Sequence, residues 1–107
     1  MEPPTQLDAN LRTIVDAIVS TAQPTRVVLF GSRARGDARP DSDYDLLIAY
    51  DRAQPHREVK SEVRCRLRPP SFSMDLFVMS SADLARQRHV ANSLAREVTE
   101  NGVVCYG

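Results

Sequence analysis

Three aspartates occupy positions where a carboxylate can do chemistry, because each lies in or at the start of an apolar run. Asp43 and Asp45 precede the run at 46–48, and Asp75 lies inside the run at 74–78. Side chains alternate along a strand, so Asp43 and Asp45 point to the same face, about 6–7 Å apart along the backbone. Tyr44, between them, points to the opposite face and is predicted to pack in the core.

A carboxylate within an apolar strand costs free energy unless something compensates it. A divalent cation is one compensator, and oxygen ligands favour Mg²⁺ or Mn²⁺ over softer metals. Taken singly, each aspartate fits a structural explanation equally well, since Asp43 can begin a strand and Asp75 can pair with an arginine. Together, in two apolar strands, Asp43, Asp45 and Asp75 predict a metal site.

A glycine–serine pair, Gly31 and Ser32, directly follows another apolar run at 27–30. Glycine lets another group approach the backbone closely, and a helical turn beginning at Ser32 directs its free N–H groups and its dipole at an anion. Arg33 and Arg35 bring positive charge to the same loop and are candidate phosphate contacts. A glycine–serine pair alone is more often a simple turn, and this one belongs to neither a Walker A loop nor a dinucleotide fingerprint.

Hydrophobic periodicity predicts the elements that must position these residues. Helices are expected at 5–21, at 54–67, and from Ser80 to a stop at Gly102. The first and the last of these begin with residues at capping-box spacing, Thr5 with Asp8 and Ser80 with Asp83. Strands are expected at 26–30, 43–50, 72–79 and 103–106, with a helical turn and a loop at 31–42. The resulting order, α-β-(turn)-β-α-β-α-β, predicts a mixed α/β fold in which helices pack on a small sheet.

Composition limits the classes of protein that fit. The 107 residues have room for one domain, spanning 1–107, and the 42% apolar and 26% charged residues are typical of a globular chain. No stretch approaches the roughly 18–20 apolar residues of a membrane span, and the N-terminus lacks the features of a signal peptide. We therefore expect a cytoplasmic protein without membrane contact, in which Cys65 and Cys105 are buried free thiols.

The balance of charges indicates which kinds of partner the protein can bind. Fourteen basic residues match fourteen acidic ones, which excludes a broad basic surface for nucleic acid. Exposed apolar helix faces in so small a domain favour self-association, so a homo-oligomer is one expectation.

The motifs together are more specific than their parts. Gly31-Ser32, ten residues, then Asp43 and Asp45, then a carboxylate in the following strand resemble the signature of the DNA polymerase beta-type nucleotidyltransferase superfamily. The strings at 31–36 and 41–46 resemble those of its minimal nucleotidyltransferases from bacteria and archaea. The resemblance covers roughly residues 27–104 in element order and implies the polymerase beta-like α/β (α+β) fold.

The resemblance also implies a role for each residue. Gly31 and Ser32 would bind a nucleotide triphosphate, Asp43 and Asp45 would hold two Mg²⁺ ions, and Asp75 would help activate the attacking hydroxyl. Two metal ions neutralise a triphosphate and acidify an acceptor hydroxyl, and a carboxylate beside a metal can accept the hydroxyl proton. The motif does not require the side chains of Arg33 and Arg35, so they rank second as phosphate contacts.

Minimal nucleotidyltransferases are often antitoxins encoded beside a helical HEPN-domain toxin, and several adenylylate a tyrosine of that toxin. The resemblance therefore implies Mg-dependent transfer of AMP from ATP to a hydroxyl, with a tyrosine of a partner HEPN toxin as the leading acceptor. Two alternatives stay open: a non-catalytic nucleotide-binding antitoxin that acts by complex formation, and a small-molecule nucleotidyltransferase. A chain of 107 residues is expected to hold no second domain for the acceptor, which favours an acceptor supplied by another polypeptide. A neutral chain is least suited to a templated polymerase.

Overall fold

The computed structural model describes residues 9–39, 42–67 and 73–107. The helices of these ranges are α1 (Ala9–Ala22), α2 (Ser32–Arg35), α3 (His56–Arg66), α4 (Ser81–Gln87) and α5 (Leu94–Asn101). The strands are β1 (Arg26–Phe30), β2 (Tyr44–Ala49), β3 (Met74–Met79) and β4 (Val103–Tyr106). The expected strands at 26–30 and 103–106 are confirmed, and β2 lies within the expected range 43–50. The expected cap at Thr5 and Asp8 and the expected strand residue Phe72 lie outside the described residues.

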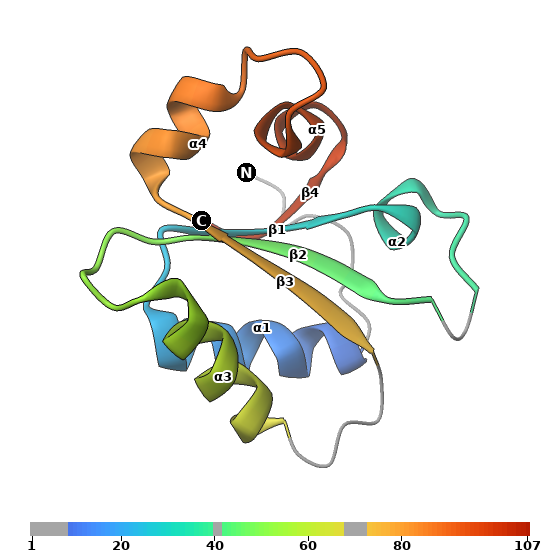
Figure 1. Cartoon of the computed structure of the whole chain (residues 1–107). Coiled ribbons are helices and arrows are strands. Elements are labelled where there is room, and N and C mark those ends of the chain that lie inside the picture. Colours follow the sequence, from blue (N-terminus) through green and yellow to red (C-terminus); the bar gives the residue numbers. More distant parts are fainter. Residues whose placement is uncertain (1–8, 40–41, 68–72) are drawn as a thin grey trace.

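The strands form one sheet in the order β3-β2-β1-β4. β1 runs antiparallel to both β2 and β4, whereas β2 and β3 run parallel and are connected through α3. A parallel pair needs such a crossover connection, whereas antiparallel strands can be joined by a short turn. Helices α1 and α3 cover one face of the sheet, and α4 and α5 lie on the other (Figure 1). The predicted mixed α/β fold, with helices packed on a small sheet, is confirmed.

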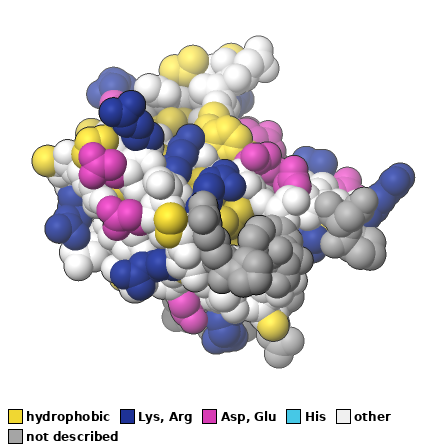
Figure 2. All heavy atoms as spheres, turned by 60° about the horizontal axis from the view of Figure 1, so that its bottom comes forward, with side chains coloured by type: hydrophobic (Ala, Val, Ile, Leu, Met, Phe, Trp, Pro, Cys, Tyr) yellow, Lys and Arg dark blue, Asp and Glu magenta, His cyan; other side chains and the backbone are white. Residues whose placement is uncertain are grey.

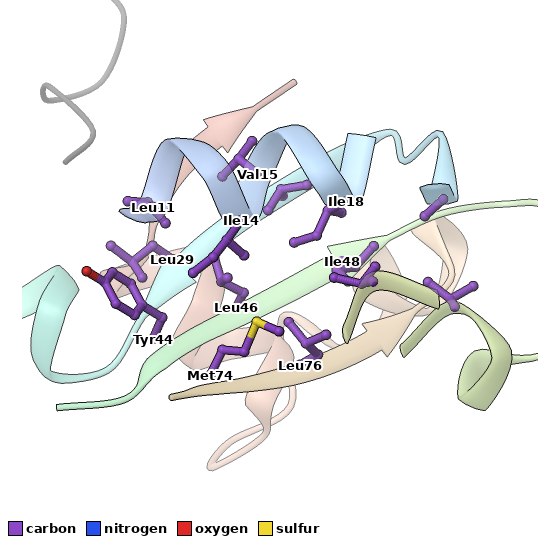
Figure 3. Packing of buried hydrophobic residues seen from close by; sticks show 14 of the residues in the cluster. Leu11, Ile14, Val15, Ile18, Leu29, Tyr44, Leu46, Ile48, Met74 and Leu76 are labelled. Atoms are coloured by element: carbon purple, nitrogen blue, oxygen red, sulfur yellow. The ribbon is translucent and has the colours of Figure 1, made fainter. Parts of the chain in front are cut away.

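The larger part of the core lies between the sheet and helices α1 and α3. The predicted apolar face of α1 is buried there against alternate residues of the strands, and burying each such side chain contributes about 1.5–3 kcal/mol. Figure 3 shows this cluster, which includes Leu11, Ile14, Val15, Ile18, Leu29, Tyr44, Leu46, Ile48, Met74 and Leu76. Tyr44 is 3% exposed, so its predicted role as a packing residue is confirmed.

The intervening strand residues form a smaller core against α4 and α5. Leu47 and Ala49 of β2 pack there with Leu84 of α4 and Val98 of α5. Asp45 occupies the same face of β2 but is only half-buried, and Asp43 and Asp75 are exposed. The two helices therefore leave open the end of this face where β2 and β3 begin.

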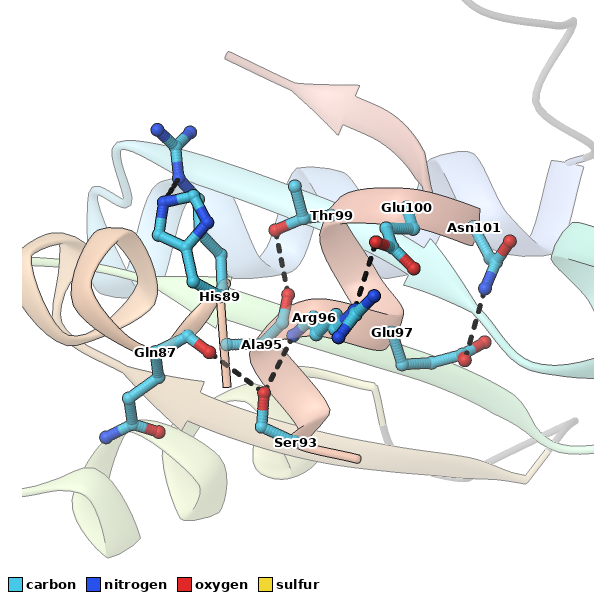
Figure 4. A network of polar contacts seen from close by, with 10 residues as sticks. Gln87, His89, Ser93, Ala95, Arg96, Glu97, Thr99, Glu100 and Asn101 are labelled. Carbon is cyan, nitrogen blue, oxygen red and sulfur yellow. Dashed lines mark hydrogen bonds and ion pairs between the residues drawn. The ribbon is translucent and has the colours of Figure 1, made fainter. Parts of the chain in front are cut away.

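The expected single helix from Ser80 to Gly102 is wrong, because the chain forms two helices. Ser80 caps α4 as its spacing predicted, accepting a hydrogen bond from the Asp83 N–H at 3.0 Å. A second cap interrupts the helix: the Ser93 hydroxyl accepts from the Arg96 N–H at 3.1 Å and donates to the Gln87 carbonyl at 2.9 Å (Figure 4). A serine that satisfies the first N–H groups of a new helix competes with continuation of the old one.

The expectation of two buried thiols is also wrong for Cys65, which is exposed on α3. The buried residues of that helix are Val59 and Val63, and a position two residues further along turns about 200° away from Val63. Cys105 is half-buried on β4, and burial raises the pKa of its thiol.

The face formed by α1 and α3 carries charges of both signs. In Figure 2, which brings the α1 and α3 side forward, Lys and Arg side chains are interspersed with Asp and Glu and do not gather into a basic patch. Within the described ranges, none of the helices combines the length and the apolarity that crossing a membrane requires.

Candidate functional site

The three aspartates meet at one end of the sheet. Asp45 lies directly opposite Asp75 in the parallel pairing of β2 with β3. Neighbouring strands are about 4.8 Å apart, so the two side chains leave the same face side by side. Asp43 precedes β2 by one residue and is two residues from Asp45. The structure thus brings together the three residues that the sequence singled out, on the face that α4 and α5 leave open.

The glycine of the predicted phosphate loop lies against this cluster. Gly31 has φ of +78°, a conformation that residues with a side chain rarely adopt. A Cβ at this position would lie 3.2 Å from the Asp45 Cγ and closer still to Oδ2. Only glycine therefore lets the backbone at the end of β1 pack against the Asp45 carboxylate.

The predicted helical turn after Gly31 is α2. The N–H groups of Ala34 and Arg35 both donate to the Gly31 carbonyl at 3.1 Å, so the turn begins at Ser32. Ser32 is half-buried, and no hydrogen bond from its hydroxyl is found within the described ranges. Ser32 is the first residue of this turn, so its N–H has no partner inside the helix. The structure therefore places the predicted helical turn at Ser32, next to the glycine that packs against Asp45, and anion binding there stays a prediction.

The two arginines of α2 differ in what they contact. Arg35 is exposed and pairs with Asp37 at 3.4 Å, and its charge partly offsets the factors that raise the pKa of Asp45. Arg33 instead donates to the Ser42 carbonyl from Nε at 3.1 Å and from Nη2 at 2.8 Å. Its guanidinium also lies over the Tyr44 ring, 3.9 Å from the centroid. Arg33 thus ties α2 to the residues that flank Asp43, a contact that the sequence did not reveal.

Removing the Arg33 side chain tests this contact. We expect Arg33→Ala to lower the free energy of unfolding by about 1–3 kcal/mol, because it leaves a carbonyl without charged donors and removes the contact with Tyr44. Arg35→Ala is the matched control and should cost less than about 1 kcal/mol, because its ion pair is exposed. Urea unfolding of both variants measures the difference. Equal stabilities for the two variants would show that Arg33 does not hold this segment.

Burial and like charge act on Asp45. Burial is the largest cause that raises the pKa of its carboxyl above the ordinary 3.8, followed by the charges of Asp75 and then Asp43. The folded protein therefore holds the Asp45 proton more tightly than the unfolded chain does. A carboxylate that is penalised by folding is ready to accept a cation, because positive charge relieves the repulsion.

This shift predicts how stability depends on pH. In the absence of divalent metal, the Asp45 contribution to the free energy of unfolding should be most favourable below pH 3.8 and decline as pH rises through the raised pKa. Asp45→Asn should remove that decline, so the stability of the wild type relative to the variant should fall across this window. Urea unfolding of both proteins in EDTA between about pH 3 and pH 7 gives the comparison. A difference that grew in favour of the wild type with rising pH would contradict the shift.

The donors fit a hard divalent cation but do not form a complete cage. Within the described parts of the chain, no group of three His, Cys, Asp and Glu side chains could hold a metal ion by itself. Mg²⁺ commonly takes only one or two carboxylates from the protein and completes its shell with water and substrate phosphates. The carboxylates beside the Gly31 backbone suit this kind of site, because a bound phosphate would supply the remaining oxygen ligands.

Comparisons with known proteins agree with the geometry. The sequence profile of the nucleotidyltransferase domain family matches residues 10–99. The chain is 28% identical over 82 residues to protein adenylyltransferase MntA from Aphanizomenon flos-aquae. That alignment covers 75% of this chain and 55% of the relative, so the chain spans just over half the length of the curated protein it matches.

A solved structure shares the fold. The crystal structure of a Sulfolobus solfataricus protein assigned as a nucleotidyltransferase superposes with a TM-score of 0.55 at 20% identity, covering 94% of this chain and 88% of that one. The profile match extends over most of the chain and includes Gly31, Ser32 and all three aspartates. This chain belongs to the nucleotidyltransferase domain family.

Proposed function

We propose that this chain transfers AMP from ATP to a hydroxyl group. The observation that carries the proposal is the packing of the Gly31 backbone against the Asp45 carboxylate, with Asp75 directly opposite in the register. A loop suited to phosphate and a cluster suited to metal are thereby adjacent, as nucleotidyl transfer requires. The end of the sheet that carries them is open on the α4 and α5 side, so a substrate can reach it.

Each residue has a role in this proposal. The backbone of Gly31 and the N–H and hydroxyl of Ser32 bind the triphosphate, with Arg35 adding charge. Asp43 and Asp45, with Asp75 beside them, would hold two Mg²⁺ ions. Bound Mg²⁺ supplies charge neutralisation of the triphosphate and a lowered pKa of the acceptor hydroxyl.

The bond changes are those of a displacement at phosphorus. The acceptor oxygen forms a bond to the α-phosphorus, the bond from that phosphorus to the bridging oxygen breaks, and pyrophosphate leaves. Asp75, exposed on β3, takes the hydroxyl proton. Arg33 acts at a distance, through its hydrogen bonds to the Ser42 carbonyl next to Asp43.

The proposed acceptor is a tyrosine of a partner HEPN-domain toxin, which would make this chain an antitoxin. The support is the similarity to MntA, a protein adenylyltransferase by name. The chain spans just over half the length of that relative, and the acceptor is tested directly.

A transfer assay provides that test. The protein is incubated with Mg²⁺, ATP labelled at the α-phosphate, and the HEPN-domain protein encoded next to it. We expect label to appear on a tyrosine of the HEPN protein, pyrophosphate to be released in equal amount, and EDTA to stop both. Neutralisation of the toxin without transfer of label would contradict the proposal and indicate inhibition by contact alone.

A further inference from the structure

An aromatic pair lies beside the aspartates on the same face of the sheet. Phe77 follows Asp75 by two residues on β3, so the two side chains are on one face, about 6–7 Å apart along the strand. Phe30 is paired with Asp45 across β1 and β2. The Phe30 and Phe77 ring centroids are 5.4 Å apart with an interplanar angle of 57°, a tilted contact within the usual range for aromatic pairs.

The two rings differ in exposure. Phe30 is 8% exposed and belongs to the core under α4 and α5, whereas Phe77 is 37% exposed. Phe77 is thus a partly exposed aromatic side chain in tilted contact with a buried ring, two residues along β3 from Asp75. What distinguishes Phe77 from other exposed apolar residues is its place, on the same face of β3 as Asp75 and in contact with Phe30.

We propose that Phe77, supported by Phe30, is a stacking platform for a planar ring held at the aspartates, and therefore a residue that determines substrate specificity. The inference rests on the proposed nucleotidyl transfer. Two rings come within reach of this position: the base of the nucleotide, whose α-phosphate lies at the aspartates, and the ring of an aromatic acceptor, whose hydroxyl lies at Asp75. Stacking of a base or a phenol on phenylalanine uses the same chemistry, which is face contact between π-systems with exclusion of water.

Substitutions that remove the ring but keep the apolar volume test the platform. Phe77→Leu and Phe77→Met lack the ring, whereas Phe77→Tyr keeps it. The control is Tyr106→Leu, which removes an aromatic side chain that is 42% exposed on the opposite edge strand. Thermal unfolding first identifies which non-aromatic variant folds as the wild type does. The probes are Mg-tripolyphosphate and Mg-ATP in calorimetric titrations, and adenosine and N-acetyltyrosinamide in saturation-transfer NMR.

The probes separate the two sources of the ring. If the base stacks on Phe77, the non-aromatic variant should bind Mg-ATP about 5- to 150-fold more weakly and bind Mg-tripolyphosphate as the wild type does. The NMR saturation-transfer signal of adenosine should then be lost. If the acceptor ring stacks on Phe77 instead, the variant should bind Mg-tripolyphosphate and Mg-ATP as the wild type does. The NMR saturation-transfer signal of N-acetyltyrosinamide should then fall. Phe77→Tyr and Tyr106→Leu should resemble the wild type in either case.

The inference is overturned if the non-aromatic variant binds all four probes within about twofold of the wild type. It is also overturned if Mg-tripolyphosphate and Mg-ATP weaken equally, because the defect then lies in the phosphate site. Failure of the wild type itself to bind Mg-tripolyphosphate would contradict the proposed function instead. Adenosine and N-acetyltyrosinamide carry no phosphate, so their measurements decide the role of Phe77 even then.

Discussion

The double variant Asp43→Asn with Asp45→Asn is expected to lose at least about a thousandfold in the rate of nucleotidyl transfer, while its fold remains intact. The two amides lack the negative charge that holds divalent cations, and metal ions contribute several kcal/mol to stabilising the charge of a phosphoryl-type transition state. The rate of label transfer in the assay described above measures the loss.

Stability separates this chemical effect from unfolding. Burial and the neighbouring carboxylates raise the pKa of Asp45, so the charged carboxyl is disfavoured in the metal-free fold. Replacing it with an amide should leave the free energy of unfolding in EDTA unchanged or higher at neutral pH. Asp16→Asn, an exposed aspartate on α1, is the matched control and should keep full activity. Retention of transfer in the double variant would rule out Asp43 and Asp45 as the metal ligands.

The Gly31→Ala substitution is expected to abolish nucleotide binding and to destabilise the protein. The positive φ of Gly31 strains any residue with a Cβ by about 1–2 kcal/mol. The added methyl group would also overlap the Asp45 carboxylate, and overpacking of this kind costs roughly a further 1–3 kcal/mol. The carboxylate would be displaced from the position facing Asp75.

Gly36→Ala is a closely matched control, because Gly36 ends α2 with φ of +84° and a Cβ there would meet nothing within 4 Å. Gly36→Ala should lower stability only by the cost of placing a Cβ at a positive φ, and it should still bind the nucleotide. Urea unfolding measures the loss of stability, and titration with Mg-ATP measures the loss of nucleotide binding. Adding Asp45→Ala to each glycine variant completes a double-mutant cycle, and the extra cost of Gly31→Ala should largely disappear in that background. An extra cost that persisted would show that the contact with Asp45 is not its source.

The sequence by itself determined the local parts of this site. Alternation placed Asp43 and Asp45 on one face and Tyr44 on the other, and the burial of Tyr44 confirms that assignment. The apolar run before Gly31 predicted β1, and the spacing of Ser80 and Asp83 predicted the cap of α4. These features depend on residues a few positions apart, whose geometry is set by the periods of strand and helix. The roles assigned to Gly31, Ser32 and the aspartates remain predictions.

Only the tertiary structure decided which distant residues meet. The register that puts Asp75 opposite Asp45 joins residues thirty positions apart and is fixed by the α3 crossover and by the burial of alternate strand residues. No local pattern told Arg33 from Arg35, because their difference lies in the path of the chain toward Ser42. The contact between Phe30 and Phe77 likewise arises across β2. Sequence periodicity sets which way a side chain faces, whereas strand register and helix packing, which are long-range, set what it faces.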